Sequence, residues 1–430
     1  MTESTMDSLI PNWQLKNSGI IAPDERLPWG QTVAVGIQHV VAMFGSTALA
    51  PIIMGFDPNV SILFSGIGTL VFFLLVGGRV PSYLGSSFAF IAVVMAVTGY
   101  SGTGPNPNIG LALGGIIAAG ALYVGIGLVV MAIGYSWVEK LMPPVVTGAV
   151  VAAIGLNLAP LAVKSISASG FDSAVGLFTV AAVGLCAVYA PGMARRLPIL
   201  LGGLASYLLY LVCANGFGLG KPIDFSGVAS AAWFGMPAFT HPEFSAPAIG
   251  LIAPIAIILV AENLGHIKAI GAMTGRDLDP YLGRAFIGDG IATIISALGG
   301  GTGVTTYAEN MGVMAATKIF STVVFVVAGL FAVVLGFSPK FGSLILTIPT
   351  PVIGGLELVV FGLIAATAGR IWVENKVDFS SPRNLFTGAV TLTAGAGDLV
   401  IKLGSFTLGG IGTATFGAII LYQILRDRDD

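Results

Sequence analysis

The chain has 430 residues, of which 55% are hydrophobic and 9% charged, and its formal net charge is −2. Soluble domains usually carry about 25% charged residues, so this composition excludes an ordinary soluble protein. The small negative charge argues against nucleic acid as a partner. Cys186 and Cys213 stand in apolar runs and are too few for a disulfide framework.

The N-terminal residues 1–29 are polar, contain Pro11, Pro23 and Pro28, and predict a cytoplasmic tail without a signal peptide. Apolar runs then recur along the chain, many of them near the ~20 residues that cross a bilayer. About fourteen membrane spans are predicted, of which the third and tenth are short. They start near residues 31, 60, 84, 110, 143, 174, 198, 247, 281, 307, 319, 345, 385 and 406. The expected fold class is an all-α polytopic membrane protein.

The basic residues test this count. With fourteen spans and a cytoplasmic N-terminus, fifteen of the 19 Lys and Arg residues fall inside, including Arg426 and Arg428. Only Lys164, Lys221, Lys340 and Lys402 fall outside. This asymmetry follows the positive-inside rule. An odd number of spans would remove it, so both termini are predicted to be cytoplasmic.

A short motif occurs twice in the same spacing. Pro144–Gly148 is followed by Gly155, and Pro351–Gly355 is followed by Gly362. The copies lie in the fifth and twelfth spans, seven spans apart, so they cross the membrane in opposite directions. This is typical of two inverted repeats of seven spans.

Two short spans carry interrupted segments, also seven spans apart. The third opens with Pro81–Phe90, and Gly299–Gly312 leads into the tenth with many glycines and threonines. Non-helical backbone at membrane depth is tolerated only where protein buries it or where it lines a cavity. A matched pair of such segments indicates a transporter's binding site. Two re-entrant turns with a packing role remain the alternative.

The eighth span carries Glu262 and His266, four residues apart on one helix face. If this span ends near Lys268, Glu262 lies ~9 Å from the inner boundary, at 1.5 Å per residue. A Glu–His pair inside a membrane is suited to proton relay. The alternative is a carboxylate satisfied by local hydrogen bonds near the interface.

Glu309 closes the second interrupted segment. A helix beginning there would point its free N–H groups into the same cavity, where they can donate to a ligand carbonyl. Phe88 and Tyr307 add flat apolar faces. Two carboxylates, backbone donors and aromatic faces suit a flat, neutral, polar-edged heterocycle, and both carboxylates would repel an inorganic anion.

Other polar residues in the spans have two interpretations each. His39 is expected either to cap a neighbouring broken segment or to be an interior histidine with a structural hydrogen bond. Asp289 is expected either to support the site from behind or to accept hydrogen bonds from backbone amides. Ser46 and Thr47 are expected either to face the cavity or to form hydrogen bonds to the backbone of their own helix. Asn310 can tie the unwound backbone to a neighbour.

Sequence motifs for catalysis are missing. The sequence contains no zinc-type Cys/His spacing, no phosphate loop ending in Lys-Ser/Thr and no nucleophile elbow. We therefore expect no enzyme, no metal and no cofactor. Glu357, in the twelfth span, has no partner that the sequence identifies.

Several motifs resemble the nucleobase–ascorbate transporter family, also called nucleobase:cation symporter-2. Glu309–Lys318 matches its signature of an acid, Asn-x-Gly-x-x-x-x-Thr and a basic residue at every defined place. Gln38-His39, Gly85–Phe90 and Ala261–His266 are also similar to the family, and the likeness covers nearly the whole chain. Within the family, Ile21–Pro28 resembles the uracil permeases of bacterial pyrimidine-utilisation operons.

The resemblance implies a fold of two inverted repeats with short antiparallel strands in segments 3 and 10. It implies a core domain of residues 30–134 and 247–340, and a gate domain of residues 135–246 and 341–430. It also implies a proton symporter in the lipid bilayer of the bacterial inner membrane, working as a homodimer.

The resemblance also implies roles for the site residues. Glu262 and Glu309 would hold the edge of uracil, and Tyr307 would lie against its ring. The backbone amides of Phe88 and Ala308 would meet its carbonyls.

His266 would assist proton coupling, with the proton as the coupling ion. Two positions depart from the uracil transporters of the family: Ala308 stands where they can have Gly, and Ser46 where they can have Ala. Both bear on pocket size and so on the choice among uracil, thymine and xanthine.

We therefore expect proton-coupled uptake of uracil or a closely related pyrimidine by alternating access, through an elevator or rocking movement. An anion transporter of the sulfate/bicarbonate type shares the architecture but should carry neutral or basic residues in place of Glu262 and Glu309. A nucleobase channel is the other alternative, and flux that does not saturate would indicate it.

Overall fold

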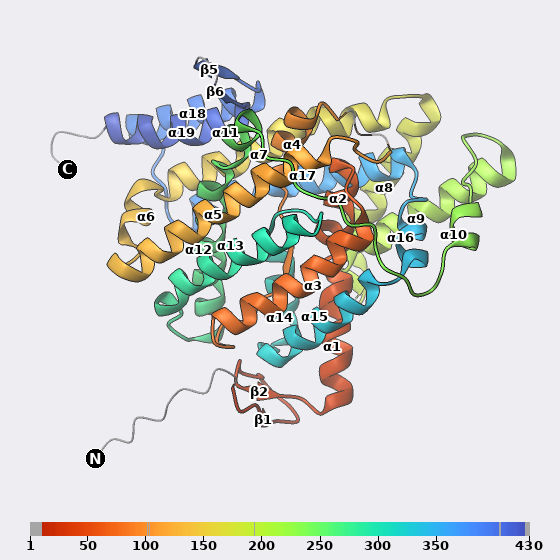
Figure 1. The fold of residues 1–430 in the computed structure, drawn as a ribbon, viewed down its shortest axis with the longest axis horizontal. Helices are drawn as coiled ribbons and strands as arrows, with labels where there is room; N and C mark the ends of the chain where they lie inside the picture. The colour runs from red at the N-terminus through yellow and green to blue at the C-terminus, as the bar shows by residue number, and fades with distance from the viewer. Residues whose placement is uncertain (1–10, 101, 103, 193, 404–405, 426–430) are drawn as a thin grey trace.

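The computed structural model describes residues 11–100, 102, 104–192, 194–403 and 406–425 (Figure 1). Residues 1–10 of the predicted tail, and Arg426 and Arg428, lie outside this part. Within it, eight helices are long and apolar enough to cross a membrane, or ten if each of two bent helix pairs is one span. The chain is thus an all-helical multi-pass membrane protein with a few short strands.

The first half of the described chain runs through β1 (Gln14–Leu15), β2 (Glu25–Arg26), α1 (Trp29–Ala42), a π-helical turn (Gly45–Leu49), α2 (Ala50–Met54), α3 (Pro58–Leu75), β3 (Leu84–Ser86), α4 (Phe90–Thr98), α5 (Ile109–Ile133), α6 (Ser136–Leu141), α7 (Pro144–Ile166), α8 (Gly170–Tyr189), a 3-10 turn (Ala194–Arg196), α9 (Pro198–Leu211), a second π-helical turn (Val212–Gly216) and α10 (Ser226–Ser230).

The second half runs through α11 (Ala246–Ile252), α12 (Ile255–Thr274), a 3-10 turn (Asp279–Tyr281), α13 (Leu282–Leu298), β4 (Val304–Thr306), α14 (Ala308–Thr317), α15 (Thr322–Gly336), α16 (Pro339–Ile345), α17 (Thr350–Glu374), α18 (Pro382–Ala396), β5 (Ile401–Leu403), β6 (Phe406–Leu408) and α19 (Gly410–Ile424).

Local sequence explains where the spans begin. At the start of α3, the Asp57 side chain accepts hydrogen bonds from the N–H groups of Asn59 and Val60, at 2.7 and 3.2 Å. Pro58 then takes the first helical position, where the missing N–H costs nothing. Several other helices, including α7, α9 and α17, likewise have proline in their first turn.

Close helix crossings depend on small residues. Where α5 crosses α13, a Cβ added to Gly120 would lie 2.8 Å from the carbonyl oxygen of Gly290, and the reverse distance is also 2.8 Å. Glycine therefore lets the two backbones touch, which is the usual basis of tight packing in membranes. Gly155 of α7 meets Ala365 of α17 in a similar way.

The helices pack in two groups. One contains α1, α3, α5, α13 and α15, with the β3–β4 pair among them, and the other contains α7, α8, α9, α17, α18 and α19. Figure 1 shows the C-terminal pair α18 and α19, with β5 and β6, at one edge of the molecule and β1 and β2 at the opposite edge.

The described part of the predicted tail is folded against the helices. β1 and β2 pair in parallel, with Gln14 opposite Glu25 and Leu15 opposite Arg26. Ile21 is 1% exposed and forms an isolated parallel bridge with Ile319, just beyond α14. A polar composition did not predict this packing, because main-chain hydrogen bonds and one apolar side chain hold the segment.

Candidate functional site

The two interrupted segments meet in the structure. β3 and β4 form an antiparallel pair in which Leu84 lies opposite Thr306 and Ser86 opposite Val304. All residues of both strands are buried. The predicted short antiparallel strands are therefore confirmed, and they connect two parts of the chain more than 200 residues apart.

The hydrogen-bond register decides which backbone groups face outward. Ser87 donates its N–H to the carbonyl of Gly303 at 2.9 Å. In an antiparallel ladder, directly opposite residues alternate between hydrogen-bonded and non-hydrogen-bonded pairs. Leu84 and Val304 therefore belong to the non-hydrogen-bonded pairs, and their N–H and C=O groups point away from the partner strand.

Hydroxyl groups of two flanking helices satisfy these outward groups. On one side, the N–H of Leu84 donates to Thr69 Oγ1 at 2.9 Å, and Ser65 Oγ donates to the carbonyl of Leu84. On the other side, Thr293 Oγ1 donates to the carbonyl of Val304 at 3.0 Å and accepts from its N–H at 3.1 Å. Helices α3 and α13 thus supply hydrogen-bond partners to the outer edges of a strand pair inside an apolar environment, where water cannot supply them.

The aromatic residues lie where the strands lead into α4 and α14. The Tyr307 hydroxyl donates to the carbonyl of Ser86 at 2.6 Å, so it ties the end of β4 to β3. The rings of Phe88 and Tyr307 are 5.7 Å apart and meet edge to face at 71°. Both side chains are almost fully buried.

The two predicted site carboxylates come from different helices. Glu262 lies on α12, and Glu309 is the second residue of α14. Helix α12 contacts both β4 and α14, so the two carboxylates lie on neighbouring elements beside the strand pair. Both side chains keep partial exposure, although the strands beside them are buried. The structure therefore brings together the residues that the sequence placed 47 positions apart.

The helix that carries Glu262 is longer than predicted. The eighth span does not end near Lys268, because α11 and α12 together run from Ala246 to Thr274. Lys268 stays within the helix since its ammonium group is paired with Asp279 at 2.7 Å. Glu262 consequently lies near the middle of this helical segment, and the predicted end of the helix near Lys268 is wrong.

His266 is bound to the strand pair. Its Nδ1 lies 2.9 Å from Thr306 Oγ1, the last residue of β4. Because His266 is one helical turn beyond Glu262 on α12, this bond orients the imidazole on the face that carries the carboxylate.

Asp289 lies at the centre of a buried hydrogen-bond network beside β4. Its Oδ2 accepts hydrogen bonds from Asn263 Nδ2 at 2.8 Å, from Thr305 Oγ1 at 3.2 Å and from the Tyr123 hydroxyl at 3.5 Å. Asn263 also donates to Tyr123 at 2.9 Å. Asp289 Oδ1 is buried and has no partner among the described residues. The network joins α5, α12, α13 and β4.

His39 and Asn310 bind one another across the site. His39 Nδ1 lies 2.6 Å from Asn310 Oδ1, which joins α1 to the residue after Glu309. The His39 ring also packs 4.6 Å from that of Phe325. His39 is thus a buried interior histidine that fixes the start of α14.

Ser46 and Thr47 bond to their own helix. Both hydroxyls donate to the carbonyl of Met43, at 3.1 and 2.7 Å. Ser46 also lies behind β3, because a Cβ added to Gly85 would come within 3.0 Å of Ser46 Cβ.

Sequence reasoning missed several residues that shape the site. Asn263 and Tyr123 of the Asp289 network, and the hydroxyls of Ser65, Thr69 and Thr293, received no role. The available signal was a polar residue inside an otherwise apolar span. Such a residue is expected to form a hydrogen bond, but the sequence does not identify its partner.

Glu357 has a partner in the structure. It is 3% exposed, and its Oε2 accepts from Ser165 Oγ at 3.1 Å, between α17 and α7. Ser165 also lines a cavity of about 740 Å³ between α7, α8, α9, α10, α16 and α17. None of the predicted site residues lines this cavity.

Comparison with known proteins shows the family. Residues 30–404 match Xan_ur_permease, described as "Permease family". The chain is 64% identical over 422 residues to RutG of Escherichia coli (strain K12), whose name describes a pyrimidine permease, covering 97% of this chain and 96% of that protein. It is 40% identical over 415 residues to a uracil permease of Paenibacillus larvae, covering 94% and 96%.

Solved structures show the fold. The transmembrane domain of the cyanobacterial bicarbonate transporter BicA matches with a TM-score of 0.60 at 17% identity, covering 91% of this chain and 97% of that one. SLC26A9 matches with a TM-score of 0.63 at 13% identity, covering 92% and 66%. With the motifs at Glu309–Lys318 and Ala261–His266 in place, the chain belongs to the Xan_ur_permease family, the nucleobase:cation symporter-2 permeases, and is a transporter rather than an enzyme.

Proposed function

We propose that this permease carries uracil, or a closely related pyrimidine, into the cell together with protons. The observation that carries the proposal is the contact of α12, which carries Glu262, with α14, whose second residue is Glu309, beside the antiparallel strands β3 and β4. The names of its relatives, a pyrimidine permease and a uracil permease, support the same substrate class.

The geometry suits the two edges of a pyrimidine. Glu262 and Glu309 accept from ring N–H groups, and the backbone N–H groups of Phe88 and Ala308 donate to ring carbonyls. Tyr307, held by its hydroxyl bond to β3, lies against the ring. A pair of carboxylates leaves no favourable place for an inorganic anion.

Ser46 acts on pocket size rather than through its hydroxyl, which its own helix occupies. It stands behind Gly85 of β3, so a smaller residue there would let the strand move back. Ala308, in the first turn of α14, narrows the pocket directly. In this proposal, the residues at these two positions determine the selectivity among uracil, thymine and xanthine.

The proton route uses Glu262 and His266. Glu262 takes up a proton on the outside and releases it on the inside. His266 assists this exchange, and its bond to Thr306 transmits the change to β4.

The movement is alternating access between a core of residues 30–134 and 247–340 and a gate of residues 135–246 and 341–430. The two packing groups of helices support this division, although the boundary at 340/341 falls inside α16. Counting α4, α14, α18 and α19 as short or broken spans gives fourteen segments in two inverted repeats. The matched starts of α7 and α17 support that symmetry.

The setting is the bacterial inner membrane, with both termini in the cytoplasm and the chain working as a homodimer. Mass measurement of the detergent-solubilised protein tests the dimer. Protease accessibility of terminal tags in right-side-out and inverted vesicles tests the orientation.

Uptake of radiolabelled uracil tests the function. Glu309→Gln keeps the shape but removes a charged acceptor, so uracil affinity should fall roughly 10- to 100-fold. Native affinity in Glu309→Gln would show that Glu309 does not bind the ligand. In vesicles, an inward pH gradient should drive accumulation in the native chain but not in Glu262→Gln, and uptake that ignores the gradient would exclude proton coupling.

The structural likeness to a bicarbonate transporter makes anion transport the second candidate function. Flux assays with sulfate and bicarbonate should show no transport. Saturable uracil flux distinguishes a carrier from a nucleobase channel, in which flux would rise linearly with concentration.

A further inference from the structure

The N-terminal segment 11–27, called here the strap, crosses the ends of two helices that carry the site. We propose that the strap is a positioning element which sets the spacing between Glu262 and Glu309. This rests on the proposed function only for the identity of the ligand. Residues Ile21–Asp24 provide the contacts, because they join the end of α14 to the end of α12.

The first link holds the end of α14. The N–H of Ile21 donates to the carbonyl of Lys318 at 3.0 Å, and the N–H of Phe320 donates to the carbonyl of Ile21 at 2.8 Å. Lys318 ends the helix in the left-handed region, with φ of 59°. The side chain of Ile21 is buried at this place. Main-chain bonds thus fix the last turn of the helix that begins with Glu309.

A second set of bonds anchors the strap to the start of α15. The carbonyl of Pro23 accepts from the N–H of Thr322 at 3.1 Å and from its hydroxyl at 2.9 Å. Trp13 Nε1 donates to the same hydroxyl oxygen at 2.9 Å, and its ring stacks 6.0 Å from Phe73 of α3. The strap is therefore held on both sides of the turn between α14 and α15.

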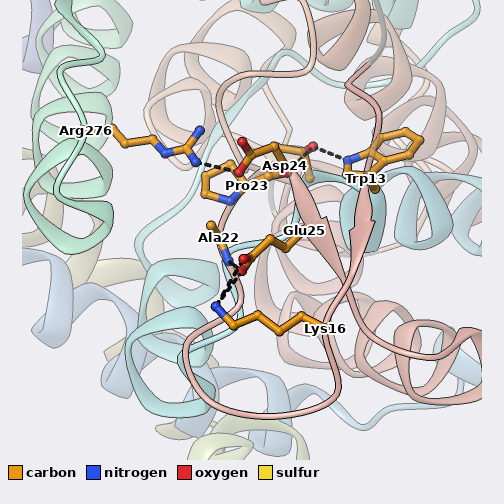
Figure 2. Close-up of polar contacts among 8 residues, drawn as sticks. Trp13, Lys16, Ala22, Pro23, Asp24, Glu25 and Arg276 are labelled. Atoms are coloured by element: carbon orange, nitrogen blue, oxygen red, sulfur yellow. Dashed lines mark hydrogen bonds and ion pairs between the residues drawn. The ribbon is translucent and has the colours of Figure 1, made fainter.

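The third link reaches α12. Asp24 Oδ1 lies 2.5 Å from Arg276 Nη2, two residues beyond the end of that helix (Figure 2). The N–H of Arg276 donates to the carbonyl of Gly271 at 3.1 Å, so its backbone is joined to the last turn. Figure 2 shows Asp24 directed toward Arg276, whereas Glu25 is directed toward Lys16.

The strap is itself braced. Glu25 accepts from Lys16 Nζ at 2.9 Å and from the N–H of Ala22 at 2.8 Å (Figure 2). Together with the β1–β2 pairing, these bonds close residues 14–26 into a loop. A braced loop transmits a displacement from one helix end to the other.

The distances make this link relevant to the site. Glu262 is ~18 Å along α12 from Thr274, and Glu309 is ~12 Å along α14 from Thr317, at 1.5 Å per residue. Helices are stiff over such lengths, so a shift at the inner ends moves the carboxylates. Direct contacts between α12 and α14 are few, so the strap adds a link between the C-terminal ends of the two helices.

Charge reversal tests the proposal. Asp24→Arg should raise the KM for uracil uptake about two- to fivefold, the range expected for a partly exposed ion pair, with a smaller change in kcat. The double variant Asp24→Arg with Arg276→Asp should restore the native KM. The matched control is Glu374→Gln, which breaks the exposed Arg370–Glu374 pair on α17 and should leave the KM unchanged.

A ligand-free readout separates this proposal from the choice of substrate. Spin labels at Ala272→Cys and Ala316→Cys, with Cys186 and Cys213 replaced by serine, report the distance between α12 and α14 by double electron–electron resonance. Asp24→Arg should broaden the distribution and the double reversal should narrow it. Unchanged distances and an unchanged KM in Asp24→Arg would overturn the strap's role. If the distances respond but the native chain binds no uracil, the strap stands and the proposed substrate falls.

Discussion

Thr293 supports β4 with a single hydroxyl that makes two bonds to Val304, one as donor and one as acceptor. Thr293→Val keeps the shape and volume of the side chain while it removes both bonds. Thr293 and Val304 are fully buried, so water cannot replace the lost partners. The variant therefore leaves one N–H and one C=O of β4 unsatisfied inside the membrane.

The expected cost follows from these two groups. An unsatisfied buried polar group costs about 1–3 kcal/mol, so the pair costs roughly 4 kcal/mol at the centre of the range. Unfolding entropy is about 2.1 cal/mol/K per residue, or ~0.9 kcal/mol/K for a chain of this length. The apparent Tm should thus fall by about 4–5 °C. Uracil affinity should fall as well, because β4 leads directly into Tyr307 and Glu309.

Thermal unfolding of the purified protein, followed by tryptophan fluorescence, measures this change. Thr391→Val is the matched control, since Thr391 is equally buried but its hydroxyl only donates to the carbonyl of Thr387 within α18, at 2.7 Å. That helix carbonyl keeps its own backbone partner, so the control should shift the Tm by about 1 °C or less. Equal shifts in the two variants would refute the assignment of Thr293 as the partner of the β4 backbone.

Three further predictions concern other parts of the molecule. Gly120→Ala at the α5–α13 crossing should lower the free energy of unfolding by about 1–3 kcal/mol through overpacking. Gly125→Ala, on the same helix but with open space beside it, should be tolerated. Equal Tm values in the two variants would contradict the close crossing. A backbone N–H and a lysine of the strap hold the pKa of Glu25 below its ordinary value of 4.5, so Glu25 stabilises the strap fully above pH 4.5 and loses this effect as the pH falls through its lowered pKa. Amide exchange of the strap should show that loss in the native chain and not in Glu25→Gln. His39→Ala and Asn310→Ala should be non-additive by about 0.5–3 kcal/mol in a double-mutant cycle on Tm, and additivity would mean that their 2.6 Å contact carries no stability.

The broken segments could be predicted because glycine and threonine interrupt apolar runs, and the membrane forbids unprotected backbone. That single constraint located the two segments that contain β3 and β4, and the carboxylate Glu309, whereas the strands themselves were expected only from the family resemblance. The family signature at Glu309–Lys318 then led to the permease family, which the comparisons confirm. Hydropathy alone could not give the extent of α12, because the charge of Lys268 suggested an end where a paired ammonium group continues the helix.

Long-range partners were beyond prediction for a different reason. The Asn263–Asp289 bond and the Ser165–Glu357 bond depend on which helix faces meet, and a nearly uniform apolar sequence contains little information about helix rotation. The strap was missed because its bonds to Lys318 and Phe320 use main-chain atoms, which every residue carries. Local composition identifies a polar tail, but it does not show where its backbone bonds go.

The hydroxyls of α3 and α13 have a consequence for recognition. Thr69, Ser65 and Thr293 already bind the outward N–H and C=O groups of Leu84 and Val304, so these groups are not available to a solute. Under the proposed function, the substrate therefore finds its main-chain donors past the strand ends, at the starts of α4 and α14. In that proposal, the β3–β4 pair sets the distance between the two helix starts, and this distance selects solutes by the separation of their hydrogen-bond acceptors.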